Sequence, residues 1–143
     1  MRTIIQRSKE SCVIVNNKVV GQIKKGLVIL VAFTDGDTLK DIDYTINKII
    51  NMRIFDGTPE KSVLELNEEI LVISQFTLYG DASKGRRPSY IKALKSDEAK
   101  NMYELFVSKM KESNLKIETG IFGADMEVHI TNDGPFTIIL DSK

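Results

Sequence analysis

The sequence predicts a single α+β domain, in which a mixed, partly barrel-like β-sheet carries two main helices. The chain has 143 residues, which fits one domain. Short apolar segments bounded by turn residues indicate strands. Two longer segments instead show helical periodicity. The order strands, helix, strand, helix, strands is typical of the α+β class. No linker or repeat divides residues 1–143.

The first strands and the first helix follow one another along the chain. Residues 2–15 alternate or run apolar, and a turn at Asn16 and Asn17 leads into residues 18–23, so two or three antiparallel strands are expected. Residues 27–33 form a continuous apolar run, typical of a central strand. Thr38 can cap a helix, with Asp41 near the capping-box position. That helix should end near Met52, and its apolar face comprises Leu39, Ile42, Ile46, Ile49 and Ile50.

The second half of the chain also contains a central strand followed by a helix. Residues 70–79 predict a second central strand, and residues 81–88 a polar, basic loop. Ser96 has the character of a helix N-cap. The apolar face of the helix after it comprises Ala99, Met102, Tyr103, Phe106 and Met110. Residues 115–119, 126–131 and 136–140 predict further strands.

Composition narrows the possible functions. The chain has 20 basic and 20 acidic residues, whereas a protein that coats nucleic acid is usually basic. One cysteine, Cys12, excludes an internal disulfide, and with one histidine, His129, it cannot build the usual zinc sets. No metal or cofactor is therefore expected. No apolar run approaches ~18 residues, and the start turns polar too soon for a signal peptide. We expect a cytoplasmic protein with no membrane span.

Polar residues interrupt the second central strand at Ser74, Gln75, Phe76 and Thr77. They either solvate an edge or form a polar cluster at the mouth of a pocket, where backbone N–H groups can bind a developing oxyanion. The hydroxyls of Ser74 and Thr77 are candidate nucleophiles, but such a nucleophile needs an adjacent base. His129 alternates with apolar neighbours, as a strand residue does. A Ser-His-Asp triad is therefore not favoured.

A second irregular segment runs from Asn132 through Gly134 and Pro135. It is either a simple hairpin turn or a place where the backbone approaches another group closely, which glycine permits. Only ~5% of X-Pro bonds in folded proteins are cis, so the sequence leaves the isomer open. In the cis form, the two carbonyls can point one way as a rigid pair of acceptors.

Two further segments have open interpretations. Lys84, Arg86 and Arg87 lie in one short loop, which is either a solvated loop or a contact for a few phosphates. Residues 120–126 include Phe122 and Met126, which either pack in the core or line a pocket.

Taken together, these segments resemble the D-aminoacyl-tRNA deacylases over nearly the whole chain. The matching runs are Met-Arg at 1–2 with Gln-Arg at 6–7, Asn-Met-Arg-Ile-Phe at 51–55, Ser-Gln-Phe-Thr-Leu-Tyr at 74–79, Lys-Gly-Arg-Arg-Pro-Ser at 84–89, Gly-Ile-Phe-Gly-Ala-Asp-Met at 120–126, and Asn-Asp-Gly-Pro at 132–135 with Thr137. The six matches keep one order and compatible spacing, which makes them far more specific than any one alone. Residues 57–62 depart from the resemblance, because they lack the longer Gly-Lys-Met-Asn run.

The resemblance implies a cytoplasmic homodimer that cleaves the ester between a D-amino acid and the 3′-terminal adenosine of tRNA. It implies that Gly134 and Pro135 form a cis pair that enters the partner subunit's site and meets the substrate ammonium, with Arg7 fixing their loop. Phe122 and Met126 would line the adenosine side. Residues 74–77 would hold the ester and the ribose.

Two catalytic alternatives follow from the resemblance. Thr77 is either a nucleophile or a supporting contact, with catalysis by backbone N–H groups and the ribose 2′-OH. The missing base favours the second.

A rigid backbone wall would exclude L side chains while leaving D side chains free in solvent. Glycine has no side chain to clash, so glycyl-tRNA mischarged on alanine tRNA is also an expected substrate. Two other functions remain open: a non-catalytic nucleic-acid-binding protein that uses the loop from Lys84 to Arg87, and another small ester or amide hydrolase.

Overall fold

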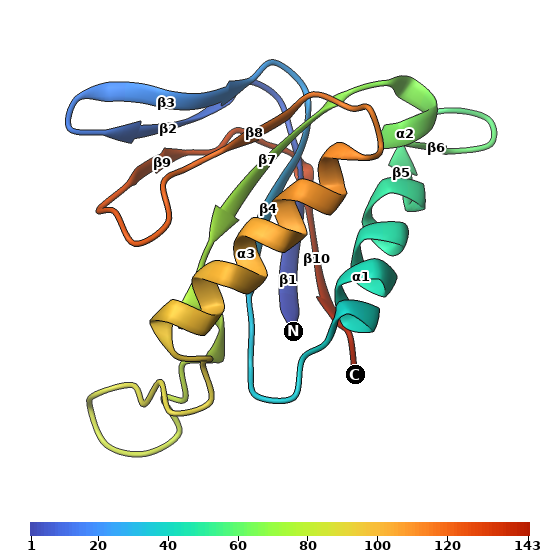
Figure 1. Ribbon diagram of the computed structural model, residues 1–143. Coiled ribbons are helices and arrows are strands. Elements are labelled where there is room, and N and C mark those ends of the chain that lie inside the picture. Colours follow the sequence, from blue (N-terminus) through green and yellow to red (C-terminus); the bar gives the residue numbers. More distant parts are fainter.

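The computed structural model describes residues 1–143, and its centre is a five-stranded mixed sheet (Figure 1). β1 is antiparallel to both of its neighbours, β10 and β4. β7 is parallel to both β4 and β8. In sheet order the strands are β10 (Asn132–Asp141), β1 (Arg2–Ser8), β4 (Gly26–Ala32), β7 (Glu69–Ser74) and β8 (Ile117–Thr119).

A second, three-stranded sheet packs on part of one face of the first. Its strands are β3 (Lys18–Ile23), β2 (Ser11–Val15) and β9 (Glu127–His129), all antiparallel. β5 (Arg53–Phe55) and β6 (Lys61–Ser62) form a separate small ladder. The sheets do not close into a barrel. The α+β class and the mixed sheet are thus confirmed, while the strands are divided among three sheets.

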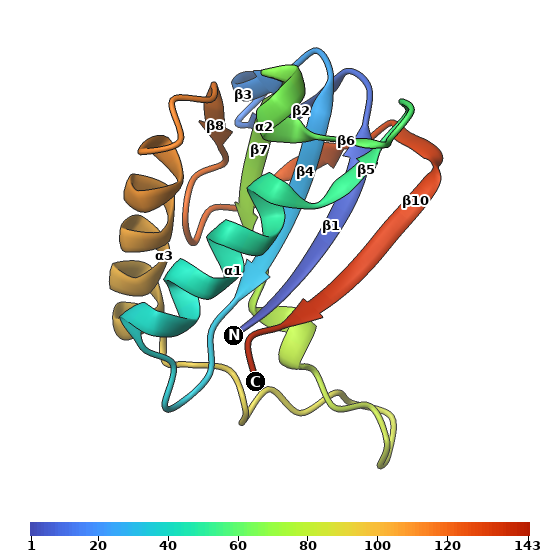
Figure 2. The same cartoon turned by 90° about the vertical axis from the view of Figure 1, so that its right-hand side faces the viewer.

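Two helices, α1 (Leu39–Asn51) and α3 (Ser96–Lys111), cover the other face of the large sheet (Figure 2). None of the helices combines the length and hydrophobicity needed to span a bilayer. The central strands are buried on both faces, which explains their continuous apolar runs. In β4, Leu27 and Ile29 belong to the core under the helices, whereas Val28 belongs to the core under the small sheet.

The capping box predicted at the start of α1 is confirmed. The backbone N–H and the hydroxyl of Thr38 both donate to Asp41 Oδ2, each at 2.8 Å. Burial opposes ionisation of Asp41, but these hydrogen bonds outweigh it and lower the pKa of the carboxyl to about 2. The helix ends at Asn51, one residue before the predicted end at Met52.

The predicted strand at residues 70–79 is wrong beyond Ser74. The Gln75 N–H donates to Val31 O at 2.8 Å, and the chain then turns into a 3₁₀-helix, η1 (Phe76–Tyr79). The polar residues therefore mark the end of the strand, because they stop the apolar run that both cores require.

Three further details of the structure differ from, or were absent from, the sequence predictions. Ser96 is the first residue of α3, and Lys95 is the N-cap. A third, short helix, α2 (Val63–Leu66), was not expected. Gly134 and Pro135 lie within β10 and not in a separate hairpin turn. They lie opposite Gln6 to Ser8 of β1, where the pairing of β1 with β10 changes register. β10 is an edge strand of the sheet, where a proline is tolerated.

Candidate functional site

A cavity of about 370 Å³ opens where the parallel strands β4 and β7 end. Ligands of open α/β sheets commonly bind at the carboxyl ends of parallel strands. Nine of its thirteen lining residues are hydrophobic. The lining comes from the ends of both strands, from the segment before α3, from α3 itself and from the loop after β8: Val31, Ala32, Phe33, Ser74, Gln75, Phe76, Tyr90, Ala93, Leu94, Ser96, Ala99, Phe122 and Gly123.

Four of the residues predicted for the site line this cavity: Ser74, Gln75, Phe76 and Phe122. Phe122 packs on the buried Tyr103 ring of α3, with 5.7 Å between the ring centroids. Thr77 is exposed and does not line the cavity, and its Oγ1 accepts a hydrogen bond from Gln75 Nε2. The geometry therefore separates the Thr77 hydroxyl from the cavity wall.

The backbone at the start of η1, which borders the cavity at Phe76, has free N–H donors. The Leu78 N–H donates to Gln75 O at 3.1 Å, and the Gln75 N–H is held by β4. The first N–H groups of a helical turn have no partner within the turn, so those of Phe76 and Thr77 are available. Two adjacent donors of this kind can stabilise an oxygen that gains negative charge.

Tyr90 is the only ionisable side chain among the residues that line the cavity. His129 is exposed on β9, in the other sheet, where it pairs with Glu127. No group of three His, Cys, Asp or Glu side chains is placed to hold a metal ion. A hydroxyl nucleophile at this cavity would thus have no protein base beside it. This agrees with the expectation that backbone N–H groups, and not the Thr77 hydroxyl, support catalysis.

Arg7 holds the segment that contains Gly134 and Pro135. Its Nε donates to Asp133 O at 3.0 Å and its Nη1 to Ile54 O at 2.8 Å. Its guanidinium also lies 5.0 Å from the centroid of the Phe136 ring. The Gly134–Pro135 peptide bond is cis.

Asn132 closes the same segment from the other side. The Phe136 N–H donates to Asn132 Oδ1 at 2.7 Å, and Asn132 Nδ2 donates to Thr137 Oγ1 at 2.9 Å. Gly134 has a φ of 143°. Residues with a side chain rarely adopt this backbone conformation, so glycine is required there. The segment is therefore fixed by polar contacts on both flanks.

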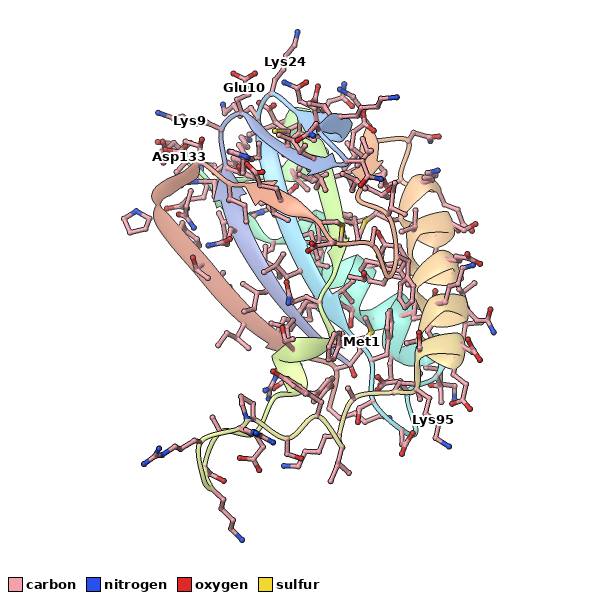
Figure 3. The ribbon with its side chains drawn as sticks, turned by 90° about the vertical axis from the view of Figure 1, so that its left-hand side faces the viewer. Met1, Lys9, Glu10, Lys24, Lys95 and Asp133 are labelled. Atoms are coloured by element: carbon pink, nitrogen blue, oxygen red, sulfur yellow. The ribbon has the colours of Figure 1, made fainter.

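Within one chain, this segment and the cavity lie at opposite ends of the sheet. Ser8 pairs with Asn132 and with Gly26, the first residue of β4, whereas Ser74 pairs with Val31 near the end of β4. At ~3.3 Å per residue, these two positions on β4 are roughly 16 Å apart. Figure 3 shows Asp133 at one end of the sheet and Lys95, which borders the cavity segment, at the other. One chain thus does not bring Gly134 and Pro135 to the cavity.

Met126 and the three cations also lie outside the cavity. Met126 packs against the core under the small sheet, and its sulfur lies close to Gly120. Lys84, Arg86 and Arg87 are exposed in a loop that projects from the body of the molecule (Figure 1). An isolated bridge between Asp81 and Ser89 closes its base. The loop leads directly into the segment that lines the cavity.

Sequence reasoning missed that segment, residues 90–96, which lies along the end of β4. Thr34 Oγ1 donates to Lys92 O at 2.6 Å, and the Leu94 N–H donates to Phe33 O at 2.9 Å. The only signal in the sequence was a few apolar residues after a basic loop. An irregular segment has no period to detect, so its place in the wall depends on these tertiary hydrogen bonds.

Comparisons with known proteins agree over the full length of the chain. The model of a family described as "D-Tyr-tRNA(Tyr) deacylase" matches residues 4–141. A "D-aminoacyl-tRNA deacylase" of Clostridium botulinum (strain Alaska E43 / Type E3) is 55% identical over 146 aligned residues, covering 100% of this chain and 98% of the relative. A protein of the same name from Aquifex aeolicus (strain VF5) is 54% identical and covers 100% and 99%.

Two solved structures share the fold. One described as "c-Myc DNA Unwinding Element Binding Protein" has a TM-score of 0.93 at 35% identity and covers 100% of this chain and 99% of its own. The other, described as "Structural Analysis of a probable eukaryotic D-amino acid tRNA deacylase", has a TM-score of 0.85 at 18% identity and covers 97% of both chains.

Proposed function

The chain belongs to the D-Tyr-tRNA(Tyr) deacylase family, and on this premise we propose that it hydrolyses the ester of D-aminoacyl-tRNA in the cytoplasm. Water adds to the ester carbonyl, the bond to the ribose 3′ oxygen breaks, and the free D-amino acid and tRNA leave. The observation that carries the proposal is the cavity at the end of β7. Its wall combines Ser74, Gln75 and Phe76 with backbone donors, and a basic loop adjoins it.

The chemistry of the cavity suits a substrate that brings its own hydroxyl. The N–H groups of Phe76 and Thr77 would stabilise the carbonyl oxygen as it becomes negative, a contribution of roughly 3–4 kcal/mol for one such donor. The ribose 2′-OH would assist the transfer of protons, since no carboxylate, imidazole or amine lines the cavity. Phe122 and the other apolar residues would hold the terminal adenosine. We keep Met126 as an outer contact on this side.

We further propose that two chains complete the site. Gly134 and Pro135 would enter the cavity of the partner subunit, because they lie too far from their own. Two features support a second copy. β10 is an edge strand with an unpaired side, and Ile139 on it is 65% exposed, which is unusual for a large apolar side chain in a sheet. A homodimer would cover both.

The segment held by Arg7 would act as the filter for chirality. A pocket that contacts side chains cannot accept every D residue and also reject every L residue, since one methylene is worth only ~1–3 kcal/mol. A backbone wall that binds the ammonium leaves one direction for a side chain, so an L side chain would clash with Gly134 and Pro135. Glycine would pass, and glycyl-tRNA mischarged on alanine tRNA is therefore a second proposed substrate.

Matched D-tyrosyl-tRNA, L-tyrosyl-tRNA and glycyl-tRNA test the proposal. The wild-type protein should deacylate the D form and the glycyl form and spare the L form. Arg7→Lys should raise L-tyrosyl-tRNA hydrolysis relative to the D form, because lysine cannot reproduce the fork of contacts that fixes the segment. Lys9→Arg is the matched control, since Lys9 also approaches Asp133, at 3.9 Å, but is exposed. Intact glycyl-tRNA, or L hydrolysis by the wild type, would refute the steric filter.

A second candidate function is nucleic-acid binding without catalysis. It is favoured by the DNA-binding description of the structure that is 35% identical and by the loop with Lys84, Arg86 and Arg87. The zero net charge argues against a broad basic face. Binding of single-stranded DNA with no turnover of any aminoacyl-tRNA would favour this function over the deacylase. An ester or amide hydrolase of another kind would instead cleave small esters but be indifferent to tRNA.

A further inference from the structure

We propose that Phe76, Tyr90 and Ile91 form a shelf that binds the unpaired nucleotides preceding the terminal adenosine of the tRNA. This inference rests on the proposed function and extends it, since it assigns the substrate a second contact outside the cavity. The enzyme would then recognise a single-stranded 3′ end and not only an acylated adenosine.

The shelf is an exposed apolar surface at the rim of the cavity. Phe76 is 57% exposed, Tyr90 41% and Ile91 90%. The rings of Phe76 and Tyr90 meet edge to face, with 5.2 Å between centroids and 69° between planes. Both rings also line the cavity, so the shelf continues its wall outward. A ligand that fills the cavity and extends from it would contact these side chains first.

The Tyr90 ring packs against the backbone of Gly80, which holds it in place. A Cβ at Gly80 would lie 3.0 Å from Tyr90 Cε1 and 3.0 Å from Thr77 O, so the ring rests directly on the backbone of Gly80. The Ala93 N–H donates to Tyr90 O at 3.0 Å and fixes the turn that follows. A ring packed in this way offers a preformed face, and holding it still costs little conformational entropy on binding.

The charge of the chain segment that carries Tyr90 and Ile91 points to a nucleic acid as the ligand. Residues 82–96 contain five cations and no Asp or Glu, although the whole chain is neutral. The cations are Lys84, Arg86, Arg87, Lys92 and Lys95. Aromatic faces beside a positively charged groove are the usual arrangement for binding single-stranded nucleic acid, with bases stacked and phosphates neutralised. The segment that carries Tyr90 and Ile91 contains both an aromatic face and these cations, which a contact for a neutral peptide or a lipid tail would not need.

Acylated oligonucleotides of increasing length test the shelf. D-Tyrosyl-adenosine fills the cavity alone, whereas D-tyrosyl cytidylyl-cytidylyl-adenosine adds two unpaired nucleotides. For the wild type, we expect the longer compound to have a kcat/KM at least about 10-fold higher, as base stacking on aromatic residues allows. This gain should disappear in Tyr90→Ala and persist in Tyr90→Phe, which keeps the ring. Val19→Ala, at an exposed apolar residue of β3, should retain the gain.

A binding measurement separates failure of the shelf from failure of the proposed function. Fluorescence anisotropy compares an uncharged RNA hairpin that has an unpaired 3′ end with the same hairpin made blunt. The wild type should prefer the unpaired form about 10-fold, and Tyr90→Ala should bind both alike. Equal binding by the wild type, or a preference that survives Tyr90→Ala, would overturn the shelf. If the preference holds but no acylated compound is cleaved, the shelf stands and the deacylase proposal fails.

The other possible occupant is a second copy of the chain. In that case Tyr90→Ala would change the molecular mass measured by light scattering and leave the preference for an unpaired 3′ end intact. That result would also overturn the proposal.

Discussion

Thr77 has a hydroxyl group that could act as a nucleophile, but this hydroxyl does not line the cavity. Its hydroxyl is exposed, accepts a hydrogen bond from Gln75 and lies outside the cavity lining. The backbone N–H of the same residue, in contrast, is one of the two free donors at the start of η1. We propose that the residue contributes through its main chain, which a substitution of the side chain does not remove.

Thr77→Ala should consequently keep near-normal activity, within about fivefold of the wild type in the kcat of D-tyrosyl-tRNA deacylation. General acid–base assistance by a side chain is typically worth 10²–10⁴-fold, so a chemical role of the hydroxyl would be well separated from a supporting contact. Gln75→Ala serves as the comparison, since Gln75 does line the cavity. A loss of roughly 10³-fold or more in kcat for Thr77→Ala would instead indicate that the Thr77 hydroxyl is the nucleophile.

At the scale of elements, the start of α1 is secured by a reciprocal cap. Asp41 is buried, which disfavours its charge, but Thr38 supplies two hydrogen bonds to the ionised form. The pKa of the Asp41 carboxyl is thus lowered to about 2 from its ordinary value of 3.8. A depressed carboxyl pKa stabilises the fold at pH values above the unfolded pKa, and this contribution disappears as the pH falls through the folded pKa.

Asp41→Asn should therefore lower the free energy of unfolding at pH 7 by about 1 kcal/mol, the usual value of a cap. The difference from the wild type should shrink as the pH falls from about 4 towards about 2, because Asp41 then becomes protonated in the wild type. Urea unfolding across this pH range provides the measurement. Asp35→Asn, at an exposed position, is the control. A difference that stayed constant over this range would contradict the account.

The neutral charge of the whole molecule limits how much of the tRNA it can hold. Five cations gather in residues 82–96, and only the acceptor end of the substrate need reach them. The contact should therefore neutralise two or three phosphates.

The affinity for D-tyrosyl-tRNA should then fall with salt along a shallow line, with a log–log slope of about −2 to −3. Replacing Arg86 and Arg87 by Gln should bring this slope closer to zero, while Lys18→Gln and Lys24→Gln, exposed on the β2–β3 hairpin and just after it, should leave it unchanged. Filter binding at several salt concentrations measures the slope. A wild-type slope near −8 would indicate a far larger footprint.

The proposed site shared by two chains leads to a further prediction for the whole molecule. Light scattering should give about twice the 16.1 kDa mass of one chain. A chain with Gly134→Val, which cannot adopt the required φ without strain, and a chain with Phe122→Asp, which damages the cavity, should each be defective alone. Mixing them by refolding should restore activity, because one site of each mixed dimer would then have an intact cavity and an intact partner segment. Activity confined to monomers would exclude the dimeric site.

The sequence determined the features that depend on local pattern. The apolar runs of β4 and β7, the helical period of α1 and its capping pair are all encoded within a few residues. The motifs along the chain also pointed to the family before any contact was known. The sequence pattern was less informative where a break in periodicity fitted either a continued strand or its end. This was the case after Ser74, where β7 ends and the 3₁₀-helix η1 soon begins.

Tertiary structure alone decided how these segments are combined. It placed residues 90–96 against the end of β4, separated the Thr77 hydroxyl from the cavity, and set Gly134 and Pro135 at the far end of the sheet. The physical reason is that sequence period reports which face of an element is buried, whereas a site depends on which strand ends meet. That is set by sheet order and register, and both arise from contacts between residues distant in the chain.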